Sequence, residues 1–237
     1  MLRSIKQLIG DKLGASDGEI GHVKDFYFDD QNWAIRYLIA DTGSWLPGRQ
    51  VLLSPHSLGR LDQGGQVLGV NLTRKQIENS PLIELHKPVS RQYEEEYYRY
   101  YGLPCYWQGD GLWGLSGFPM QVIPAAPLPE APTAAGDPRS QRADAHLQSA
   151  QAVKGYGLQA TDGTVGHVCD FMMEAESWVI RQVIIKTGHR FSGKEVALPT
   201  NLVDRIHYEE STVSVKLTKA AVEQSPEHDL ATIRARD

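Results

Sequence analysis

The stretch "GHVKDF" at residues 21–26 returns as "GHVCDF" at residues 166–171. A His and an Asp three positions apart, twice in one chain, could belong to two metal sites, to two catalytic dyads, or to one structural joint built twice. The surrounding sequence favours the joint, because residues 15–81 match residues 160–226 without a gap. Self-similarity over this length indicates a tandem duplication.

Within one repeat the periodicity is typical of β-strands. Segments such as "WAIRYLIA" and "QVLGVNL" are short, rich in β-branched and aromatic residues, and separated by Gly, Asp and Asn. Thr73 can cap a short helix that Pro81 ends. Several short strands with one terminal helical turn predict a mainly β fold, in which each repeat is a small antiparallel barrel or curled sheet.

The match divides the chain into two barrels and a connecting segment. We expect a first domain at 1–88, a connection at 89–150, a second domain at 151–230 and a C-terminal tail at 231–237. The connection is expected to begin with a short aromatic helix. Its "FPMQVIPAAPLPEAPTAAGDPRSQRADAH" stretch is rich in Pro and Ala and is predicted to be a mobile linker.

The apolar positions of "IGHVKDFYF" lose their alternation between Val23 and Phe26. A strand of period two needs an extra residue to do this, so we expect a β-bulge near Lys24 and Asp25. A hairpin turn at "DDQN" would place Asp25 opposite Arg36, where opposite charges help to fix the register. We therefore interpret Asp25 as the structural partner of an arginine or of bulge amides rather than as a catalytic group. Eight residues receive a structural role in this way: Gly21, Asp25, Trp33, Arg36, Gly166, Asp170, Trp178 and Arg181.

Reaction chemistry leaves no recognisable pattern in the sequence. There is no GxSxG, no GxGxxG after a strand, no phosphate loop and no HExxH, so no catalytic residue, metal site or cofactor is expected. In a regular strand His22 and His167 would point away from the neighbouring Asp, and a shared surface contact is the role left open for them. The two cysteines, Cys105 and Cys169, exclude a disulfide framework by their number, and Cys169 is interpreted as a small filler.

Charge and hydropathy limit the classes of partner. A formal net charge of −5 and a pI near 5.9 argue against nucleic acid, because phosphate binding depends on Lys and Arg. No run of 18 apolar residues exists and the first residues do not resemble a signal peptide, so we expect a cytoplasmic protein without a membrane span. The oligomeric state is left open.

The segment "SRQYEEEYYRYYG" at 90–102 predicts a helix that Ser90 caps and Gly102 ends. Its tyrosines fall on one face, and further aromatic residues follow, which makes a partner-binding surface one interpretation. The alternative is that the helix packs back on a barrel of its own chain. The candidate partner-binding residues are Tyr93, Tyr97, Tyr101, Tyr106, Trp107 and Trp113.

The run "DGEIGHVKDFYFDDQNWAIRYLIADTGSWLPGRQVLLSP" and its copy "DGTVGHVCDFMMEAESWVIRQVIIKTGHRFSGKEVALP" both resemble the PRC-barrel family. That family includes the cytoplasmic domain of the photosynthetic reaction-centre H subunit and a domain of a ribosome-maturation factor. The turn glycines, the Asp after "GHV" and the Trp that opens the next strand carry the resemblance. It implies a fold rather than a reaction.

The chain departs from both well-known members of the family. It lacks the N-terminal membrane helix of H subunits, and both of its halves are PRC-like, whereas the ribosome factor joins one such barrel to a different one. The arrangement of two barrels around a joint resembles stand-alone bacterial PRC-barrel proteins.

The function expected from the sequence is a non-enzymatic adaptor or scaffold that binds another protein, for example in a membrane-associated complex. One alternative is an accessory of photosynthetic light-reaction electron transfer that resembles the H subunit. Others are a ribosome-assembly factor, which the acidic charge disfavours, and an enzyme or metal-dependent protein, which would contain bound metal.

Overall fold

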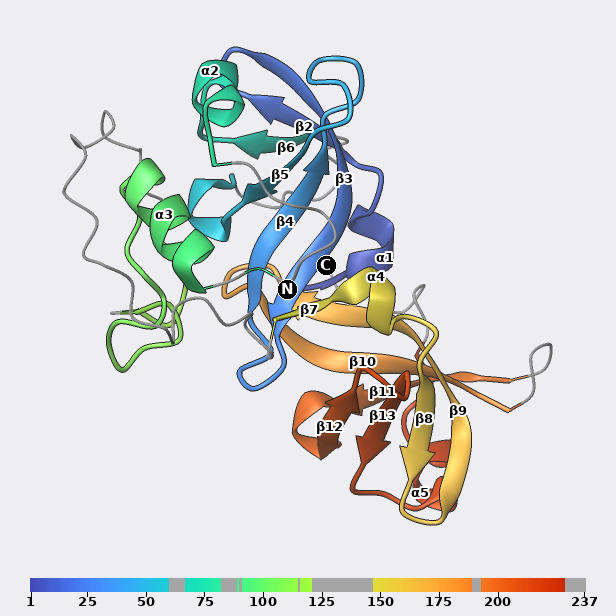
Figure 1. The fold of residues 1–237 in the computed structure, drawn as a ribbon. Coiled ribbons are helices and arrows are strands. Elements are labelled where there is room, and N and C mark those ends of the chain that lie inside the picture. Colours follow the sequence, from blue (N-terminus) through green and yellow to red (C-terminus); the bar gives the residue numbers. More distant parts are fainter. Residues whose placement is uncertain are drawn as a thin grey trace.

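The computed structural model describes residues 1–59, 67–81, 89, 91–114, 116–120, 147–188 and 193–228. These residues form two β-sheets, one from each repeat, which occupy the upper and lower parts of Figure 1. The prediction of a mainly β fold is confirmed.

The first sheet is built from residues 12–70 of the first repeat. Its strands are β2 (Lys12–Ala15), β3 (Gly18–Asp29), β4 (Ile35–Asp41), β5 (Gln50–Leu53) and β6 (Val67–Val70), in the order β5-β4-β3-β2-β6. The 3₁₀ turn η1 (Pro55–Ser57) follows β5, and the helix α2 (Arg74–Glu78) follows β6. As expected, Thr73 caps α2, in a capping box with Gln76.

The second sheet repeats this plan with one additional strand. It contains β8 (Gly157–Ala160), β9 (Gly163–Glu174), β10 (Val179–Thr187), β11 (Glu195–Pro199), β12 (Val203–His207) and β13 (Thr212–Val215). The order is β11-β10-β9-β8-β13-β12, with η2 (Thr200–Leu202) between β11 and β12 and α5 (Lys219–Glu223) at the end.

The two small antiparallel barrels expected from the sequence are not confirmed, and their purely antiparallel pairing needs correction. Both sheets are mixed, because β2 pairs with β6 in parallel and β8 pairs with β13 in parallel. Within the described ranges, no ladder of hydrogen bonds joins β5 to β6 or β11 to β12. The backbone itself links the two edge strands of each sheet. It passes from β5 through η1 toward β6 in the first sheet, and from β11 through η2 to β12 in the second.

The β-bulge predicted from the lost alternation is confirmed in both repeats. Val23 pairs with Ala40 and Asp25 with Ile39, which leaves Lys24 as the extra residue. In the second repeat the register shifts at Cys169, the equivalent of Lys24. The bulge turns the two long central strands, β3 and β9, so that each keeps its apolar side chains in the core.

A second bulge, which the sequence does not reveal, lies on the opposing strands. Tyr27 pairs with Tyr37 but Phe28 pairs with Ile35, so Arg36 is the extra residue of β4. Arg181 has the same place in β10. The predicted opposition of Asp25 and Arg36 is therefore wrong, because each residue belongs to a different irregularity of the hairpin.

The glycines of the two motifs permit a close approach of strands. A Cβ atom on Gly21 would lie 1.9 Å from the carbonyl oxygen of Asp41, and one on Gly166 would lie 2.2 Å from that of Lys186. No side chain fits at either distance, and this explains why both copies of the motif begin with glycine.

Two short arms are exchanged between the repeats. The first arm, β1 (Leu2–Ser4) and α1 (Ile5–Leu8), precedes the first repeat but pairs antiparallel with β9 of the second. The second arm, β7 (Leu147–Ser149) and α4 (Ala150–Val153), precedes the second repeat but pairs antiparallel with β3 of the first. Figure 1 shows α1 and α4 side by side where the two sheets meet.

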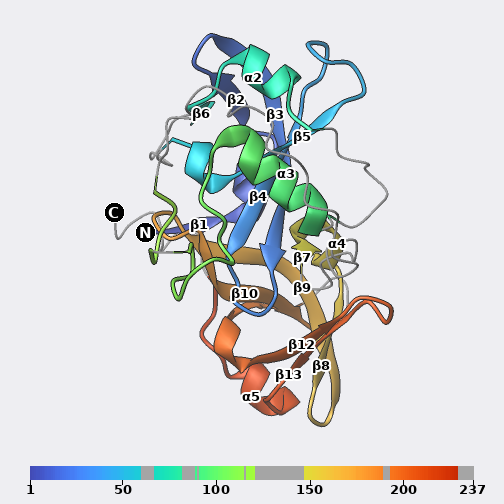
Figure 2. The same cartoon turned by 60° about the vertical axis from the view of Figure 1, so that its left-hand side comes forward.

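One apolar core runs through both repeats. It includes contacts across the junction such as Phe28 with Phe171, whose ring centroids are 5.5 Å apart, and Phe26 with Trp178 at 6.5 Å. The helix α3 (Arg91–Tyr101) covers β4 on the first repeat, as Figure 2 shows from a second direction. The two repeats are therefore packed together rather than separated.

The predicted connection at 89–150 ends inside the second arm. Of its linker, residues 121–146 lie outside the described residues, as does the predicted tail at 231–237. Among the described helices, none combines the length and the apolar character that crossing a membrane requires.

Candidate functional site

The aromatic segment after the first repeat folds against its own chain. The helix α3 ends at Gly102, whose φ of +63° lies in the left-handed region, as the sequence predicts. The side chains of Tyr97, Tyr101, Tyr106 and Trp113 are each at most 6% exposed, while Tyr93 and Trp107 are half-buried. Burial removes Tyr97, Tyr101, Tyr106 and Trp113 from the predicted partner-binding surface and supports the alternative of packing within the chain, whereas a binding role of the half-buried Tyr93 and Trp107 stays a prediction.

A buried carboxylate organises the tyrosines. Glu94 is fully buried, and its Oε1 accepts hydrogen bonds from the hydroxyls of Tyr37 at 2.6 Å and Tyr106 at 2.9 Å. Its Oε2 lies 2.9 Å from Nη1 of Arg91, which reaches partly into solvent. Burial, together with the negative Glu94, raises the pKa of Tyr37 well above its usual value. The raised pKa values keep the phenols of Tyr37 and Tyr106 protonated, so both can donate to the carboxyl group of Glu94.

Arg36 joins this cluster to the second bulge. Its guanidinium donates to the Leu112 carbonyl at 2.7 Å and to Asp29 at 3.3 Å, and it lies over the ring of Tyr106, 3.9 Å from the centroid. Burial opposes the charge of Asp29, but Arg36 and the hydrogen bonds from Asn32 outweigh it, so the Asp29 pKa is lowered. Arg36 therefore has a structural role, with Asp29 as its acid in place of Asp25.

Asp25 and Asp170 each hold the arm of the other repeat. Asp25 accepts from the Ser149 hydroxyl at 2.5 Å and from the backbone N–H of Gln151 at 3.0 Å. Asp170 accepts in the same way from the Ser4 hydroxyl at 2.5 Å and from the N–H of Lys6 at 2.9 Å.

Both carboxylates also accept the N–H of the next residue in their own strand, Phe26 or Phe171, at 2.7 Å. Burial raises the pKa of Asp25, although the hydrogen bonds from Ser149 and Gln151 oppose the change. These contacts define the inter-repeat joint, which consists of the two arms and the strands β3 and β9.

The two tryptophans belong to the same joint. Trp33 and Trp178 have positive φ values of 57° and 55°, in the turns that precede β4 and β10. The carbonyl of Trp178 accepts from Ile35 N–H at 2.8 Å, and the carbonyl of Trp33 accepts from Ile180 N–H at 2.7 Å. The remaining predicted partner, Arg181, donates to Glu174 at 2.6 Å and so repeats the pairing of Arg36 with Asp29.

The two repeated histidines lie on equivalent strands of different sheets, His22 on β3 and His167 on β9. His22 is exposed and pairs with Lys12 and Asp41 on the two adjacent strands. His167 is half-buried and pairs with Gly157 and Lys186 in the same way. In the part of the chain that the structure describes, His, Cys, Asp and Glu side chains do not gather in groups of three or more that could hold a metal ion. The shared surface contact of the two histidines stays a prediction.

The two thiols are poorly placed for nucleophilic chemistry. The Cys169 thiol donates to the Ile184 carbonyl at 3.3 Å, and burial raises its pKa to about 12. Burial also raises the pKa of Cys105. A thiol with a raised pKa holds its proton near neutral pH, when only the thiolate attacks.

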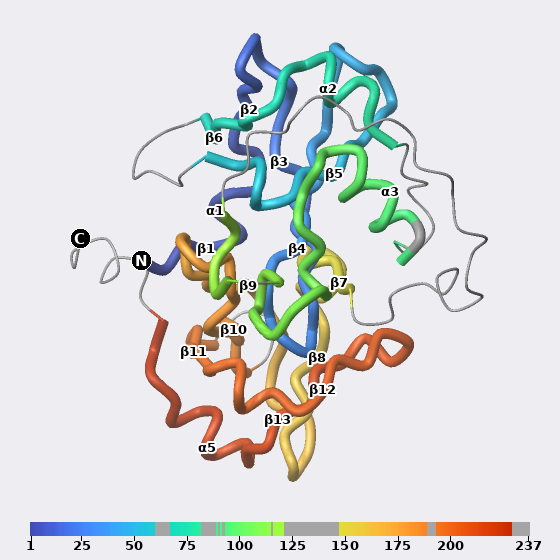
Figure 3. The backbone as a smooth tube through the Cα atoms, turned by 90° about the vertical axis from the view of Figure 1, so that its left-hand side faces the viewer, coloured from blue at the N-terminus to red at the C-terminus, as the bar shows by residue number. Residues whose placement is uncertain are grey.

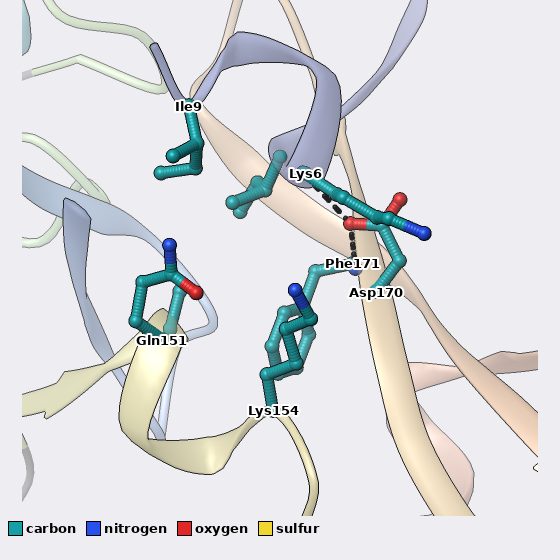
Figure 4. A pocket seen from close by; sticks show the side chains of 8 residues that line it. Lys6, Ile9, Gln151, Lys154, Asp170 and Phe171 are labelled. Carbon is teal, nitrogen blue, oxygen red and sulfur yellow. Dashed lines mark hydrogen bonds between the residues drawn. The ribbon is translucent and has the colours of Figure 1, made fainter. Parts of the chain in front are cut away.

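A small cavity opens between α1 and α4. Its volume is about 70 Å³, and Figure 4 shows the side chains of Lys6, Gln151 and Lys154 around it, with Asp170 bonded to two backbone N–H groups. This volume is far below the 300–1,000 Å³ of pockets that bind small molecules. The cavity marks the joint rather than a substrate site.

A larger groove lies between the first repeat, the segment at 117–120 and the turn that joins β9 to β10. Its volume is about 880 Å³. Figure 3 shows the chain that follows α3 running down beside β1 and β9. The groove is lined by Met1, Pro55, Leu58, Gly59 and residues 117–120 and 174–178. It therefore draws on both repeats and on the connection between them.

Apolar side chains are concentrated at this groove. Five large apolar side chains of the described residues are exposed, and three of them line it: Met1 at 41%, Phe118 at 56% and Met120 at 54%. The wall from the second repeat includes two acidic residues, Glu176 and Glu174, of which Glu174 is paired with Arg181. Exposed apolar groups gathered in one place are typical of a protein-binding surface, whereas single ones are ordinary.

A buried histidine fastens one wall of the groove. His56 is 1% exposed and its Nδ1–H donates to the carbonyl of Met120 at 2.8 Å, while its ring meets the edge of Trp113. Burial lowers the pKa of His56, and the nearby charge of Arg36 acts in the same direction. The imidazole is therefore neutral, and it holds the segment at 117–120 against the first repeat.

Sequence reasoning placed Phe118 and Met120 in a linker and so missed them. The available signal was the sequence "FPM", two large apolar residues around a proline at the start of a stretch with little other apolar bulk. The groove itself could not be inferred, because its walls come from positions as far apart as Pro55 and Trp178. No model of a known protein family matches this sequence, and no curated protein matches it as a relative.

Proposed function

We propose that this chain is a non-enzymatic adaptor that binds a segment of a partner protein in the groove at residues 117–120 and 174–178. The observation that carries the proposal is the concentration of exposed apolar side chains at one groove to which both repeats contribute. The chemistry of the described residues also favours binding over catalysis, because the carboxylates of Glu94 and Asp25 and the thiol of Cys169 are committed to structural hydrogen bonds.

The groove favours an apolar peptide segment flanked by basic residues. Phe118 and Met120 present apolar surface from one wall, and the other wall includes the acidic residue Glu176, while the carboxylate of Glu174 is already paired with Arg181. A flexible Met beside a rigid aromatic ring adapts to different apolar side chains. The net charge of −5 adds a general attraction for a basic partner.

The resemblance of both repeats to the PRC-barrel family agrees with an adaptor role, since its sequence features specify a scaffold rather than a reaction. We therefore propose a duplicated PRC-type scaffold that works in the cytoplasm. No feature of the groove favours electron transfer or ribosome assembly over protein binding.

The test is the selection of displayed random peptides on the purified chain, followed by affinity measurement of the enriched peptides. We expect apolar sequences with a flanking Lys or Arg, and we expect Phe118→Ser with Met120→Ser to weaken their binding about tenfold or more. Val67→Ser with Tyr208→Ser is the matched control, because these side chains are equally exposed but lie outside the groove. Peptides that bind both double variants equally well would disprove the assignment of the groove.

A further inference from the structure

The inter-repeat joint has the internal symmetry of a homodimer. Its contacts come in pairs that are related by the same shift of 145 residues as the sequence repeat: Ser4 with Asp170 is matched by Ser149 with Asp25. The N–H of Lys6 on Asp170 is likewise matched by that of Gln151 on Asp25. Such reciprocity, in which each side gives and receives the same contact, defines the interface of a two-fold dimer.

The backbone pairings obey the same rule. Strand β1 pairs with β9 over three residues, and β7 pairs with β3 over three residues. The two turns exchange hydrogen bonds through the carbonyls of Trp33 and Trp178, and Ala34 forms a bridge with Val179.

The cavity between the arms marks the centre of this arrangement. Its lining contains three pairs of equivalent residues, which are Ile5 with Ala150, Lys6 with Gln151, and Ile9 with Lys154. Figure 4 shows the two short helices facing each other across it. Side chains that meet their own equivalents lie beside a two-fold axis, so the approximate axis passes between α1 and α4.

We propose that the inter-repeat joint is a complete protein–protein interface, whose partner is another repeat of the same kind, on the same chain or on a second copy of it. Each repeat carries both halves of the device: an arm with a Ser that donates, and a strand with an Asp that accepts. The interface therefore needs no covalent connection between the repeats. Two polypeptides that each carry one repeat pair through it, and repeats of different copies exchange.

The contacts of the joint account for its strength. Each carboxylate receives a hydroxyl and a backbone N–H from the other repeat, and hydrogen bonds to a charged acceptor are stronger than neutral ones. Aromatic contacts such as Phe28 with Phe171 add buried apolar area beside them.

The experiment cuts the full chain between residues 121 and 146, through an inserted recognition sequence of a site-specific protease, with complete cleavage checked on a denaturing gel. Under native conditions we expect the cut chain to sediment as one particle with the mass of the intact chain, 26.4 kDa. A cut chain with an affinity tag on the second repeat, mixed with cut chain lacking it, should yield hybrids that contain an untagged first repeat. Separation of the cut wild-type chain into two species at micromolar concentration would overturn the proposal, and so would an absence of hybrids.

Substitutions in the inter-repeat joint test whether its specific hydrogen bonds, rather than non-specific association, hold the two pieces of the cut chain together. Asp25→Ala and Asp170→Ala should each weaken the association of the cut chain about tenfold to a hundredfold, because each leaves a hydroxyl and an N–H without their acceptor. Asp17→Ala and Asp162→Ala are the matched controls, since these aspartates accept the N–H of Arg74 and Lys219 within their own repeats.

Equal association of joint variants and controls would show that the arms do not hold the repeats together. Circular dichroism of the uncut variants checks that they are folded. A joint variant that unfolds is replaced by Ser4→Ala with Ser149→Ala, which removes the two donors and keeps both carboxylates.

Discussion

Replacing Glu94 with alanine tests whether the buried acid organises the aromatic cluster. The substitution leaves the hydroxyl of Tyr37, which is fully buried, and that of Tyr106, which is 6% exposed, without their shared acceptor. Each buried hydroxyl that loses its partner costs about 1–3 kcal/mol. The loss of the Arg91 contact adds less, because the Arg91 side chain is 31% exposed and can turn to solvent.

We therefore expect Glu94→Ala to lower the free energy of unfolding by about 2–6 kcal/mol, which is the combined cost of the two orphaned hydroxyls. Glu94→Gln keeps an acceptor oxygen for the tyrosines and should cost less. Glu95→Ala, one residue further on the exposed face of α3, is the matched control and should stay within the ~0.5 kcal/mol that is usual for surface positions. Urea unfolding followed by circular dichroism measures all three values.

A double-mutant cycle with Tyr37→Phe sharpens the test. If the cost of Glu94→Ala includes an orphaned phenol, it should shrink in the Tyr37→Phe background, since no hydroxyl remains to be orphaned. An effect of Glu94→Ala that is no larger than that of Glu95→Ala, or one that is unchanged by Tyr37→Phe, would refute the reasoning.

Two further predictions concern the close approach of the strands and the wall of the groove. Gly21→Ala should destabilise the chain strongly in thermal unfolding, because its Cβ would lie 1.9 Å from the carbonyl oxygen of Asp41, whereas Gly69→Ala meets nothing within 4 Å and should be tolerated. The pKa of His56 is lowered in the folded chain, so its contribution to stability is complete above the unfolded value of about 6.5 and is lost as the pH falls below it. The free energy of unfolding measured between pH 7.5 and 5 should therefore fall by up to about 1.4 kcal/mol per pH unit from this group, and His56→Gln should remove that part of the slope. An identical slope in wild type and variant would contradict the assignment.

The features that could be predicted from sequence are those with a local signal. The bulge at Lys24 was visible because the alternation of apolar residues slips by one place, and α2 was visible because Thr73 can cap a helix and Pro81 ends it. The second bulge at Arg36 left no such trace, since the residues around it are apolar on both faces of β4. This hidden irregularity is the reason that the predicted pairing of Asp25 with Arg36 was wrong.

The candidate site depended on contacts that no local pattern reports. The stripe of tyrosines on α3 predicted a helix with an apolar face, but the spacing of residues does not say what covers that face, and the first repeat covers it. The exchange of the arms joins Ser4 to Asp170, 166 residues further along the chain. The sequence duplication alone does not indicate this pairing, because it does not say which strand each arm joins. Phe118 was assigned to the linker because the stretch that follows it is rich in proline and alanine. That composition is typical of a linker, and the short sequence "FPM" at its start was not enough to indicate a binding surface.

The exchanged arms also set an order of events during synthesis. At about 5–20 residues per second, the ribosome needs roughly 10–30 s to move from Ser4 to Asp170, and for that time the apolar side chains of the first arm have no strand to cover them. In the first repeat, the end of β3 likewise has no partner strand until the second arm, up to Ser149, has been synthesised. Neighbouring nascent chains on one messenger RNA are at different stages of this wait, so an older chain can offer its β9 to a younger chain's arm. During synthesis, pairing of the first arm with β9 of its own chain therefore competes with pairing between neighbouring nascent chains.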